Sequence, residues 1–516
     1  MRVVLASLLT AVLFFSFMPG ARADDAQSLL AKHKAFVGWQ FGDGTFTSFD
    51  MQRDGVTKKG QTDRAIEHRV GLVYRRNYGA GNATGFTGKI FWGTTRNGFT
   101  VPYIGDEAQR MLAIDVLMME GTTELPAELH GSTTIDGKTV PVVRVTMKGA
   151  KPIDLAIDPA TGAYLQATVD PDGSPETISI ASYTTLPDGK KMIGSWSLDG
   201  ERYTYTKIIP NPQLVDRNFT PPAPLASWTF GSAAPVPIGV TDERIYLNAK
   251  VNGVPGTFVL DTGASGIYLT DEFANRAHVK TIGTARASGI GGDVKTLKRQ
   301  AKTIDLGNGN VLSNALIYTD NETYREGKFN QEVDGFFGFD FLAGARVSVN
   351  LGAKTMTIQP DDEAATAPAG GYVVSVDLSG DVPVVPMELD GKVNVDAIMD
   401  TGNAAVGVLA SSKIRDHGVV MVSALRAQGG DGLIANQGFL GGNRTIVGIG
   451  GETERVYCGS LDKVVIGPFV YQNNGVCLSA NQSLHDGLLG FDFLKNFDYI
   501  FDYHHGTIVM IPRRNN

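Results

Sequence analysis

The sequence predicts a mainly β protein in which one β-rich unit occurs twice, preceded by a further antiparallel β-rich region with some helix. Three observations predict this fold. The chain of 516 residues contains 62 glycines and several Asn-Gly and Asp-Gly pairs, which favour hairpin turns between short strands. Short apolar or alternating runs lie between these pairs. An apolar strand that ends in Asp-Thr-Gly occurs at two places, residues 261–263 and 400–402.

The N-terminus has the pattern of a secretory signal peptide, residues 1–23. Arg2 gives a positive start, residues 3–18 are almost wholly apolar, and Ala21-Arg22-Ala23 is a small-x-small cleavage site. The apolar run is too short for a stable membrane span, and no later stretch approaches the roughly 20 apolar residues that a span needs. We therefore expect an exported protein, periplasmic or secreted, with no transmembrane span in its mature chain.

The net charge indicates which partners to expect, and the cysteine content indicates whether a disulfide is expected. The formal net charge is −8, and removing a signal peptide that carries two arginines and no acid gives −8 − 2 = −10. An acidic chain of this kind is not expected to bind nucleic acid. The two cysteines are Cys458 and Cys477. In an exported protein we expect a disulfide between them, and the alternative is two separate thiols.

The chain is too long for one hydrophobic core, and its composition divides the mature part into three domains. An N-terminal domain spans 24–225 and ends in a proline-rich stretch. The first repeat spans 236–359, and an acidic, Ala/Pro-rich linker spans 360–371. The second repeat spans 372–512.

The N-terminal domain is expected to begin with a helix and continue as an antiparallel meander. Apolar residues on one face predict the helix at 25–38. Asp-Gly pairs at short spacing separate the strand-like runs that follow, which is typical of a meander. The predicted strands are 139–147, 162–169, 174–183, 191–198 and 201–209.

Three elements occur in the same order in both repeats. The Asp-Thr-Gly triplet comes first, then Gly-Ile-Gly-Gly, and then an Asp-Gly-apolar-apolar-Gly-Phe-Asp-Phe-Leu loop. The copies of the second element are 289–292 and 448–451, and those of the third are 334–342 and 486–494. The distance from Asp261 to Gly289 is 28 residues and that from Asp400 to Gly448 is 48 residues, so the second copy carries an extra stretch. A single Asp-Thr-Gly is a weak signal, whereas three matched elements in one order indicate a duplicated unit.

A duplicated unit that presents one carboxylate per copy can bring two carboxylates together. Asp261 and Asp400 each end an apolar strand, where a following glycine allows backbone amides to approach the carboxylate. Two carboxylates about 3 Å apart cannot both ionise readily, so they share one proton and titrate as a unit. One then deprotonates a water while the other hydrogen-bonds a scissile carbonyl.

These motifs resemble the aspartic proteases, and specifically retropepsin-like domains fused in tandem, over residues 236–512. The resemblance implies two acid-protease β-barrel lobes in one chain that hydrolyse peptide bonds with no cofactor and no metal. It makes Asp261 and Asp400 the catalytic dyad. The active-site turn and hydroxyl grip would be formed by Thr262, Gly263, Thr401 and Gly402. The two substrate-covering flaps would be formed by Gly289, Ile290, Gly291 and Gly292, and by Gly448, Ile449, Gly450 and Gly451. Because both lobes lie on one chain, the resemblance implies a monomer with a peptide or protein substrate.

Two positions depart from the pattern of the pepsin-like enzymes. Ala264 stands where those enzymes have a Ser or Thr that hydrogen-bonds the carboxylate, so we expect a pH optimum nearer neutral. Asn403 stands at the same position in the second copy, where its amide either donates to Asp400 or distorts the turn. Asp340 and Asp492, which follow the glycine-rich loops, are expected to cap the short helices there and to pair with backbone amides.

The role of residues 24–225 stays open. The meander with its leading helix is similar to the half-barrel of periplasmic lipoprotein-carrier domains, which would give a concave face for an apolar ligand. The alternatives are a folding or docking module and an activation pro-domain. For the whole chain the leading hypothesis is an exported aspartic endopeptidase. The alternative is a non-catalytic peptide- or lipid-binding protein on a degenerate protease scaffold.

Overall fold

The computed structural model describes residues 25–513 apart from a set of gaps. The gaps are 80, 242, 290–291, 320–331, 405–406, 411–432, 435–438, 441, 448–452 and 480–485. The fold is mainly β, as predicted. The chain divides into two compact units: unit 1 comprises the chain up to Thr45 and Val116–Gly200, and unit 2 comprises Phe46–Asp115 and the chain from Glu201 onward. No helix among the described residues is long and apolar enough to cross a membrane.

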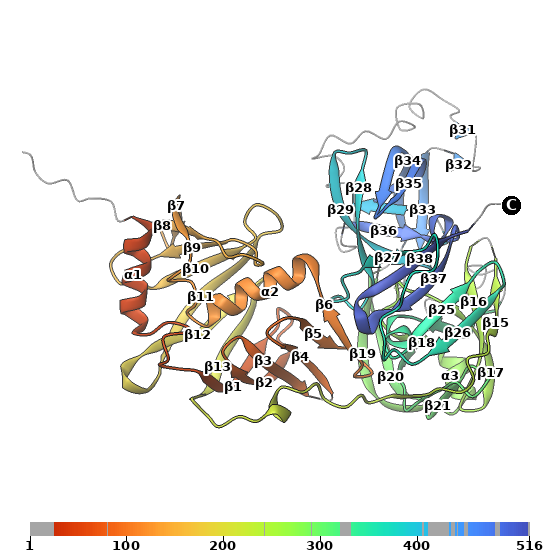
Figure 1. Cartoon of the computed structure of the whole chain (residues 1–516), viewed down its shortest axis with the longest axis horizontal. Coiled ribbons are helices and arrows are strands. Elements are labelled where there is room, and N and C mark those ends of the chain that lie inside the picture. The colour runs from red at the N-terminus through yellow and green to blue at the C-terminus, as the bar shows by residue number, and fades with distance from the viewer. Residues whose placement is uncertain are drawn as a thin grey trace, which may run out of the picture. The chain divides into compact units, whose positions relative to one another are not determined.

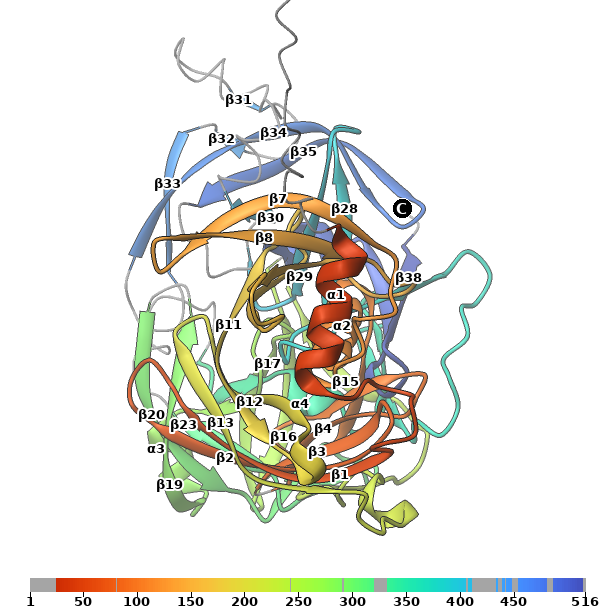
Figure 2. The same cartoon turned by 90° about the vertical axis from the view of Figure 1, so that its left-hand side faces the viewer.

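The described residues of unit 1 contain one complete α-helix and six antiparallel strands. Helix α1 (Ala26–Val37) begins after Asp25, whose carboxylate accepts the Ser28 N–H at 2.7 Å, and it ends at Gly38, where φ is 78°. The predicted helix at 25–38 is therefore confirmed. The strands pair in the order β7-β8-β9-β10-β11-β12, and α1 contacts β7 and β12 (Figure 2). Their bounds are β7 (Ala127–Ile135), β8 (Lys138–Val145), β9 (Ile153–Ile157), β10 (Tyr164–Val169), β11 (Glu176–Thr185) and β12 (Lys191–Leu198).

Unit 2 begins with an antiparallel sheet in which six strands were not predicted from the sequence. The order is β6-β5-β4-β3-β2-β1-β13. Helix α2 (Gly105–Met118) follows β6, and its Leu112 packs against a buried cluster of Tyr74, Phe86 and Phe91. The strands are β1 (Ser48–Val56), β2 (Thr62–Val70), β3 (Val73–Gly79), β4 (Asn82–Phe86), β5 (Phe91–Thr94), β6 (Thr100–Tyr103) and β13 (Glu201–Pro210). Five predicted strands are confirmed. Four lie in unit 1, at 139–147, 162–169, 174–183 and 191–198, and the fifth, at 201–209, is β13.

In the first repeat, a strand from late in the sequence lies between two strands from early in the sequence. Strand β24 (Gly335–Phe337) lies between β17 (Val254–Leu260) and β18 (Ile267–Leu269), parallel to β17 and antiparallel to β18. Helix α3 (Asp271–Arg276) follows β18 and α4 (Phe339–Leu342) follows β24. Strand β14 (Ser227–Thr229) precedes the repeat and pairs with β22 (Val311–Ser313). The other strands of the repeat are β15 (Val236–Val240), β16 (Ile245–Val251), β19 (Lys280–Gly289), β20 (Gly292–Gln300), β21 (Thr303–Asp305), β23 (Leu316–Thr319), β25 (Arg346–Asn350) and β26 (Thr355–Gln359).

The second repeat has the same arrangement. Strand β36 (Gly487–Gly490) lies between β29 (Val393–Asp400) and β30 (Gly407–Ala410), parallel to β29 and antiparallel to β30. Helix α7 (Phe491–Leu494) follows β36. The remaining strands are β27 (Tyr372–Ser375), β28 (Val384–Leu389), β31 (Leu433–Ile434), β32 (Phe439–Leu440), β33 (Gly442–Val447), β34 (Thr453–Ile466), β35 (Phe469–Ser479), β37 (Phe497–Asp502) and β38 (Thr507–Pro512).

One sheet joins the two repeats. Its strands run in the order β15-β26-β25-β37-β38-β27, so that each repeat contributes its first strand and its last two (Figure 1). At the junction β25 is antiparallel to β37, with Val347 opposite Phe501 and Val349 opposite Tyr499. All four side chains are buried in one hydrophobic core that both repeats share. This sheet fixes the repeats against each other, which the site below requires.

The predicted hairpin turns before the triplets are confirmed. Asn252 and Gly253 have φ values of 50° and 85°, and Asp390 and Gly391 have values of 52° and 66°. Positive φ at both central residues belongs to the two-residue turn that matches strand twist, for which Asn-Gly and Asp-Gly are the usual choice. These turns return the chain along β17 and β29, and so they aim both strands at the site.

Several predictions concern residues outside the described part of the chain. They include the signal peptide 1–23, the tips of both flaps and most of the extra stretch in the second repeat. The predicted domain boundaries stay predictions. The division into compact units places residues 46–115, from the predicted N-terminal domain, together with the two repeats.

Candidate active site

The two aspartates lie at the ends of matched buried strands. Asp261 directly follows β17, and Asp400 is the last residue of β29. The inserted strands support both ends, since Leu260 lies opposite Phe337 and Asp400 lies opposite Gly490. Because each strand end is held on both sides by hydrogen-bonded neighbours, the carboxylates project from rigid positions.

Each carboxylate is held by two backbone amides of its own turn. Oδ1 of Asp261 accepts the N–H groups of Gly263 at 3.0 Å and Ala264 at 3.1 Å. This geometry leaves Oδ2 for the partner carboxylate or for a water. It is the backbone approach that the Asp-Thr-Gly sequence predicts.

The second turn repeats the first. Oδ1 of Asp400 accepts the N–H groups of Gly402 at 2.9 Å and Asn403 at 3.1 Å. Asn403 therefore contributes the same backbone donor as Ala264 in the first turn. Of the two expectations for this residue, a distorted turn is wrong because the hydrogen bonds to Asp400 keep their lengths.

The glycines of the two turns make room for the opposite carboxylates. A Cβ on Gly263 would lie 2.6 and 2.7 Å from the two carboxylate oxygens of Asp400. A Cβ on Gly402 would overlap the carboxylate of Asp261 in the same way. Each carboxylate thus packs against the backbone of the other turn, and the two repeats bring Asp261 and Asp400 together.

Two threonines lock the turns to each other beneath the carboxylates. The Thr262 N–H donates to Oγ1 of Thr401 at 3.1 Å, and the Thr401 N–H donates to Oγ1 of Thr262 at 3.0 Å. The hydroxyls donate onward to the opposite strands, from Thr262 to the Met399 carbonyl at 2.5 Å and from Thr401 to the Leu260 carbonyl at 2.7 Å. Both threonines are buried, so these bonds are shielded from water. This is the reciprocal contact that the resemblance implies for these residues.

The electrostatics of the pair favour a shared proton. Burial, followed by the nearby charge of Asp400, raises the pKa of Asp261 well above its ordinary value. Burial also raises the pKa of Asp400, against the lowering effect of its hydrogen bond with Asp261 and of its backbone donors. Both residues remain partly exposed, so solvent reaches them. Two interacting carboxyls of this kind lose their protons in two steps that belong to the pair.

The glycine-rich loops run beside the turns in both repeats. Phe339 N–H donates to the Ala264 carbonyl at 2.8 Å, and Phe491 N–H donates to the Asn403 carbonyl at 2.7 Å. A Cβ on Gly338 would collide with the carbonyl oxygen of Ala264, which explains why the loop needs glycine there. The third matched element of the sequence therefore supports the turn that carries the carboxylate.

The described parts of the flaps are hairpin strands. In the first repeat β19 pairs with β20 up to Gly289 opposite Gly292, and Ile290 and Gly291 lie outside the described residues. In the second repeat β33 pairs with β34 up to Val447 opposite Thr453. Gly448, Ile449, Gly450 and Gly451 lie outside the described residues. A substrate-covering role for both hairpins stays a prediction.

The cysteines lie opposite each other in one hairpin. Cys458 of β34 is paired in register with Cys477 of β35, and the Cys477 side chain is buried. The Cys458 side chain is not among those described. The register is the one that the predicted disulfide needs, and the disulfide itself stays a prediction.

A buried contact from the unpredicted sheet reaches the first repeat. Asn97, in the turn between β5 and β6, accepts the Leu316 N–H at 2.6 Å and donates to the Leu316 carbonyl at 3.1 Å. Its own N–H donates to Oδ1 of Asp340 at 3.0 Å. The prediction that Asp340 caps its helix is wrong, because helix α4 has no side-chain cap. The prediction that its carboxylate pairs with a backbone amide is confirmed by the bond from Asn97. The Asn97-Gly98 pair between two apolar runs is a hairpin signal that could have predicted this turn.

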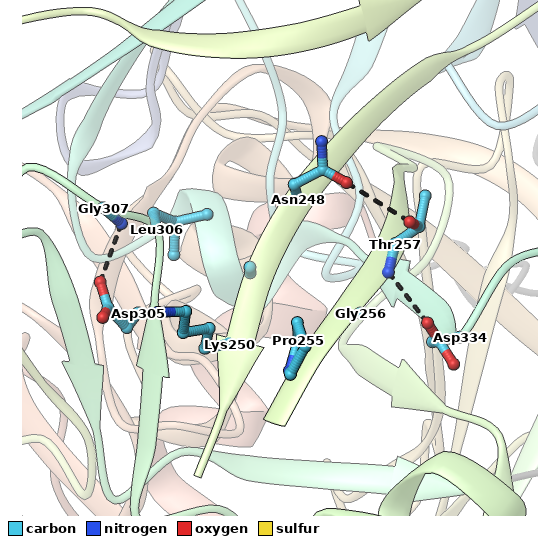
Figure 3. A pocket seen from close by; sticks show the side chains of 10 residues that line it. Asn248, Lys250, Pro255, Gly256, Thr257, Asp305, Leu306, Gly307 and Asp334 are labelled. Carbon is cyan, nitrogen blue, oxygen red and sulfur yellow. Dashed lines mark hydrogen bonds between the residues drawn. The ribbon is translucent and has the colours of Figure 1, made fainter. Parts of the chain in front are cut away.

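A separate hollow of about 500 Å³ lies over β16 and β17, away from the dyad (Figure 3). Thr257 N–H donates to Asp334 at 2.9 Å, and Gly307 N–H donates to Asp305 at 2.8 Å. Neither Asp261 nor Asp400 lines it. Among the described residues no three His, Cys, Asp or Glu side chains are grouped as metal ligands would be.

One family model matches part of the first repeat. Residues 247–341 match the aspartyl protease family, and this stretch contains Asp261 and most of its glycine-rich loop. No curated protein matches the chain. Among solved structures, an aspartic proteinase from Irpex lacteus aligns at 14% identity with a TM-score of 0.35, over 55% of this chain and 97% of its own. A DUF1329 family protein from Desulfovibrio piger ATCC 29098 aligns at 12% identity with a TM-score of 0.29, over 38% of this chain and 95% of its own.

Proposed function

We propose that this protein is an exported aspartic endopeptidase in which Asp261 and Asp400 form a catalytic dyad. The observation that carries the proposal is the packing of each carboxylate against the glycine of the opposite turn, with both turns locked by reciprocal threonine bonds. Two carboxyl groups packed this closely can share one proton, an arrangement that suits activation of a water and that binding alone does not require.

In the proposed reaction the ionised member of the dyad removes a proton from a water between the carboxyls. The water oxygen attacks the peptide carbonyl carbon, while the protonated member donates its proton to the carbonyl oxygen. The resulting neutral gem-diol breaks its C–N bond as the amide nitrogen takes a proton from one carboxyl of the dyad and one diol hydroxyl gives its proton to the other carboxylate. The products are a free carboxylic acid and a free amine, and the dyad regains its single proton.

The substrate of the proposed enzyme is an extended peptide. The two hairpins, β19–β20 and β33–β34, are placed one per repeat, and the proposal gives their Gly-Ile-Gly-Gly tips the role of closing over the substrate. Glycine at such tips lets backbone groups approach a peptide closely. Both turns belong to one chain, so the proposal needs no second copy and predicts an active monomer.

The pH range of activity follows from the raised pKa values. The active form holds one proton on the pair, and it is lost as the pH rises through the upper pKa of the dyad. Since burial raises the pKa of Asp261 well above its ordinary value, we expect activity to extend towards neutral pH. Activity confined to below about pH 4 would contradict this.

The test is cleavage of a diverse peptide library by the chain from residue 24 onward, at several pH values from 3 to 8. We expect cleavage by the wild type, inhibition by pepstatin-type compounds, and no cleavage by Asp261→Asn or Asp400→Asn. Asp492→Asn is the matched control, because this aspartate lies on the surface and pairs with Lys495 at 2.6 Å. Absence of cleavage at every pH would favour the alternative, a non-catalytic peptide- or lipid-binding protein.

A further inference from the structure

The turn between β5 and β6 brings an arginine next to the catalytic turn of the first repeat. Nη1 of Arg96 donates to the Tyr268 hydroxyl at 3.2 Å, and its guanidinium lies 5.3 Å from the ring centre of Tyr318. A Cβ on Gly266 would lie 3.5 Å from Nη1. Gly266 is the fifth residue after Asp261, and its carbonyl is tied to Gly338 N–H at 3.1 Å. Arg96 therefore lies at a rigid edge of the site.

The residues under Arg96 connect the dyad with the first flap hairpin. Tyr268 and Tyr318 belong to one buried cluster with Ala264 and Phe336. Ala264 donates to Asp261, and Ala285 of strand β19 packs against the same cluster. A peptide that lies between the hairpin and the dyad must therefore pass beside this cluster, with Arg96 at its edge.

Arg96 keeps part of its hydrogen-bonding capacity for another group. Its side chain is 33% exposed, and its Nε lies 3.5 Å from Oδ2 of Asp381. A guanidinium carries five N–H donors, of which Tyr268 takes one and Asp381 faces another. Within the described part of the chain, Nη2 has no hydrogen-bond partner. A planar guanidinium with free donors is well suited to bind a carboxylate through two hydrogen bonds.

We propose that Arg96 is a specificity-determining residue that selects peptides with a glutamate or aspartate a few positions from the scissile bond. The inference rests on the proposed endopeptidase function. Side chains of an extended peptide alternate between two faces and advance about 3.3 Å per residue, so a residue two to four positions from the cut reaches beyond the dyad. The arginine comes from outside the two repeats, and so the preference would not be predicted from the repeats alone.

Arg96 also joins Tyr268 to Asp381, and a purely structural brace would use the same contacts. The two roles differ in what removal of Asp381 does. If Arg96 is only a brace, loss of either partner has the same effect on cleavage. If Arg96 recognises substrate, loss of Asp381 removes a competing carboxylate and strengthens the preference for acidic peptides.

The experiment profiles cleavage sites in a diverse peptide library, using the chain from residue 24 onward and five variants. These are Arg96→Gln, Arg96→Lys, Arg96→Glu, Asp381→Asn and the control Arg64→Gln, whose arginine is exposed and pairs with Asp54. Thermal unfolding of each variant shows that it is folded. The readout is the enrichment of Glu and Asp at each position around the cut, followed by kcat/KM for matched Glu and Gln peptides.

For the wild type we expect acidic enrichment at one position and a Glu-to-Gln ratio of kcat/KM of about 10, the size of one charge-assisted contact. Arg96→Gln should bring this ratio to about 1, Arg96→Glu should favour Lys or Arg at that position, and Arg96→Lys should keep part of the preference. Asp381→Asn should raise the ratio, and Arg64→Gln should leave it unchanged.

Two results would overturn the inference while the endopeptidase stands. One is wild-type cleavage with no acidic enrichment at any position. The other is an Asp381→Asn profile that matches that of Arg96→Gln, which is the result of a brace. If the wild type cuts no peptide, the proposed function fails, and the inference fails with it.

Discussion

The Phe-Asp-Phe-Leu segment occurs once in each repeat, as α4 and α7, and its aspartate has opposite surroundings in the two copies. Asp340 is fully buried and accepts the Asn97 N–H at 3.0 Å. Asp492 keeps 29% of its side chain exposed and pairs with Lys495 at 2.6 Å. The local sequence and the helix are the same, and among the described residues the difference comes from the β5–β6 turn, which contacts the first copy. An identical motif therefore does not give its residues an identical role.

The Asp-Thr-Gly turns show the reverse case. Ala264 and Asn403 differ in side chain, yet each donates its backbone N–H to the preceding aspartate at 3.1 Å. The backbone N–H of this residue makes the hydrogen bond to the aspartate, so the change from Ala264 to Asn403 leaves that bond unchanged. The two repeats therefore match at the two aspartates, and they differ where the β5–β6 turn contacts the first repeat.

The largest expected effect comes from filling the space between the two turns. Gly263→Ala and Gly402→Ala each place a methyl group on the opposite carboxylate, so we expect kcat/KM to fall by about 10³-fold or more because the dyad is pushed apart. The matched control is Gly352→Ala, where the nearest atom to the new Cβ is 3.4 Å away. Equal activity of Gly263→Ala and the control in a peptide cleavage assay would show that the turns are not in contact.

The twin aspartates predict a difference in the pH dependence of stability. Burial raises the pKa of Asp340 to about 7, from 3.8 for an ordinary Asp. The folded protein therefore holds this proton more tightly, and the stability that results is complete below about pH 4 and lost as the pH rises to about 7. The full difference is about 4 kcal/mol.

Asp340→Asn keeps an acceptor for Asn97 and has no charge, so it should flatten this dependence. Asp492→Asn should leave the dependence as in the wild type. Denaturant unfolding at pH values from 4 to 8 measures both. The same slope in Asp340→Asn and the wild type would count against a buried, protonated Asp340.

Much of the two repeats could be predicted from the sequence, and the first sheet of unit 2 could not. Asp261 and Asp400 were found because three matched elements repeat in one order, and each element is local. The role of Asn97 depends on Leu316 and Asp340, more than 200 positions away. One sequence carries no signal for such a contact. The strands from 48 to 103 were missed for a related reason, since partial burial on both faces weakens their alternation.

The reciprocal threonine contact predicts that removing either hydroxyl lowers the free energy of unfolding by a similar amount. Thr262→Val and Thr401→Val each remove one hydroxyl and leave a buried backbone carbonyl without its donor, so each should destabilise folding by about 1–3 kcal/mol. Thr→Ser at either position retains the hydroxyl and serves as the control. Denaturant unfolding measures the loss, and a destabilisation confined to one of the two positions would contradict a reciprocal contact.

The smallest expected effect is at the position that differs between the turns. Asn403→Ala makes the second turn like the first and retains the backbone N–H that donates to Asp400. We expect kcat/KM to change by less than about fivefold, because the Asp400 carboxylate is held by the backbone N–H of residue 403 and not by the Asn403 side chain. A loss as large as that of Asp400→Asn would instead assign the Asn403 amide a part in catalysis.

The most direct test of the central claim, that Asp261 and Asp400 act as one unit, is a double-mutant cycle on kcat/KM. We would measure cleavage of one good peptide by Asp261→Asn, Asp400→Asn and the double variant. Residues that act together show non-additive losses, so we predict that each single change costs at least about 10³-fold and that the double variant is no slower than the singles by more than a few-fold. Losses that multiply in the double variant, or a single variant that keeps most of its activity, would contradict a shared-proton dyad.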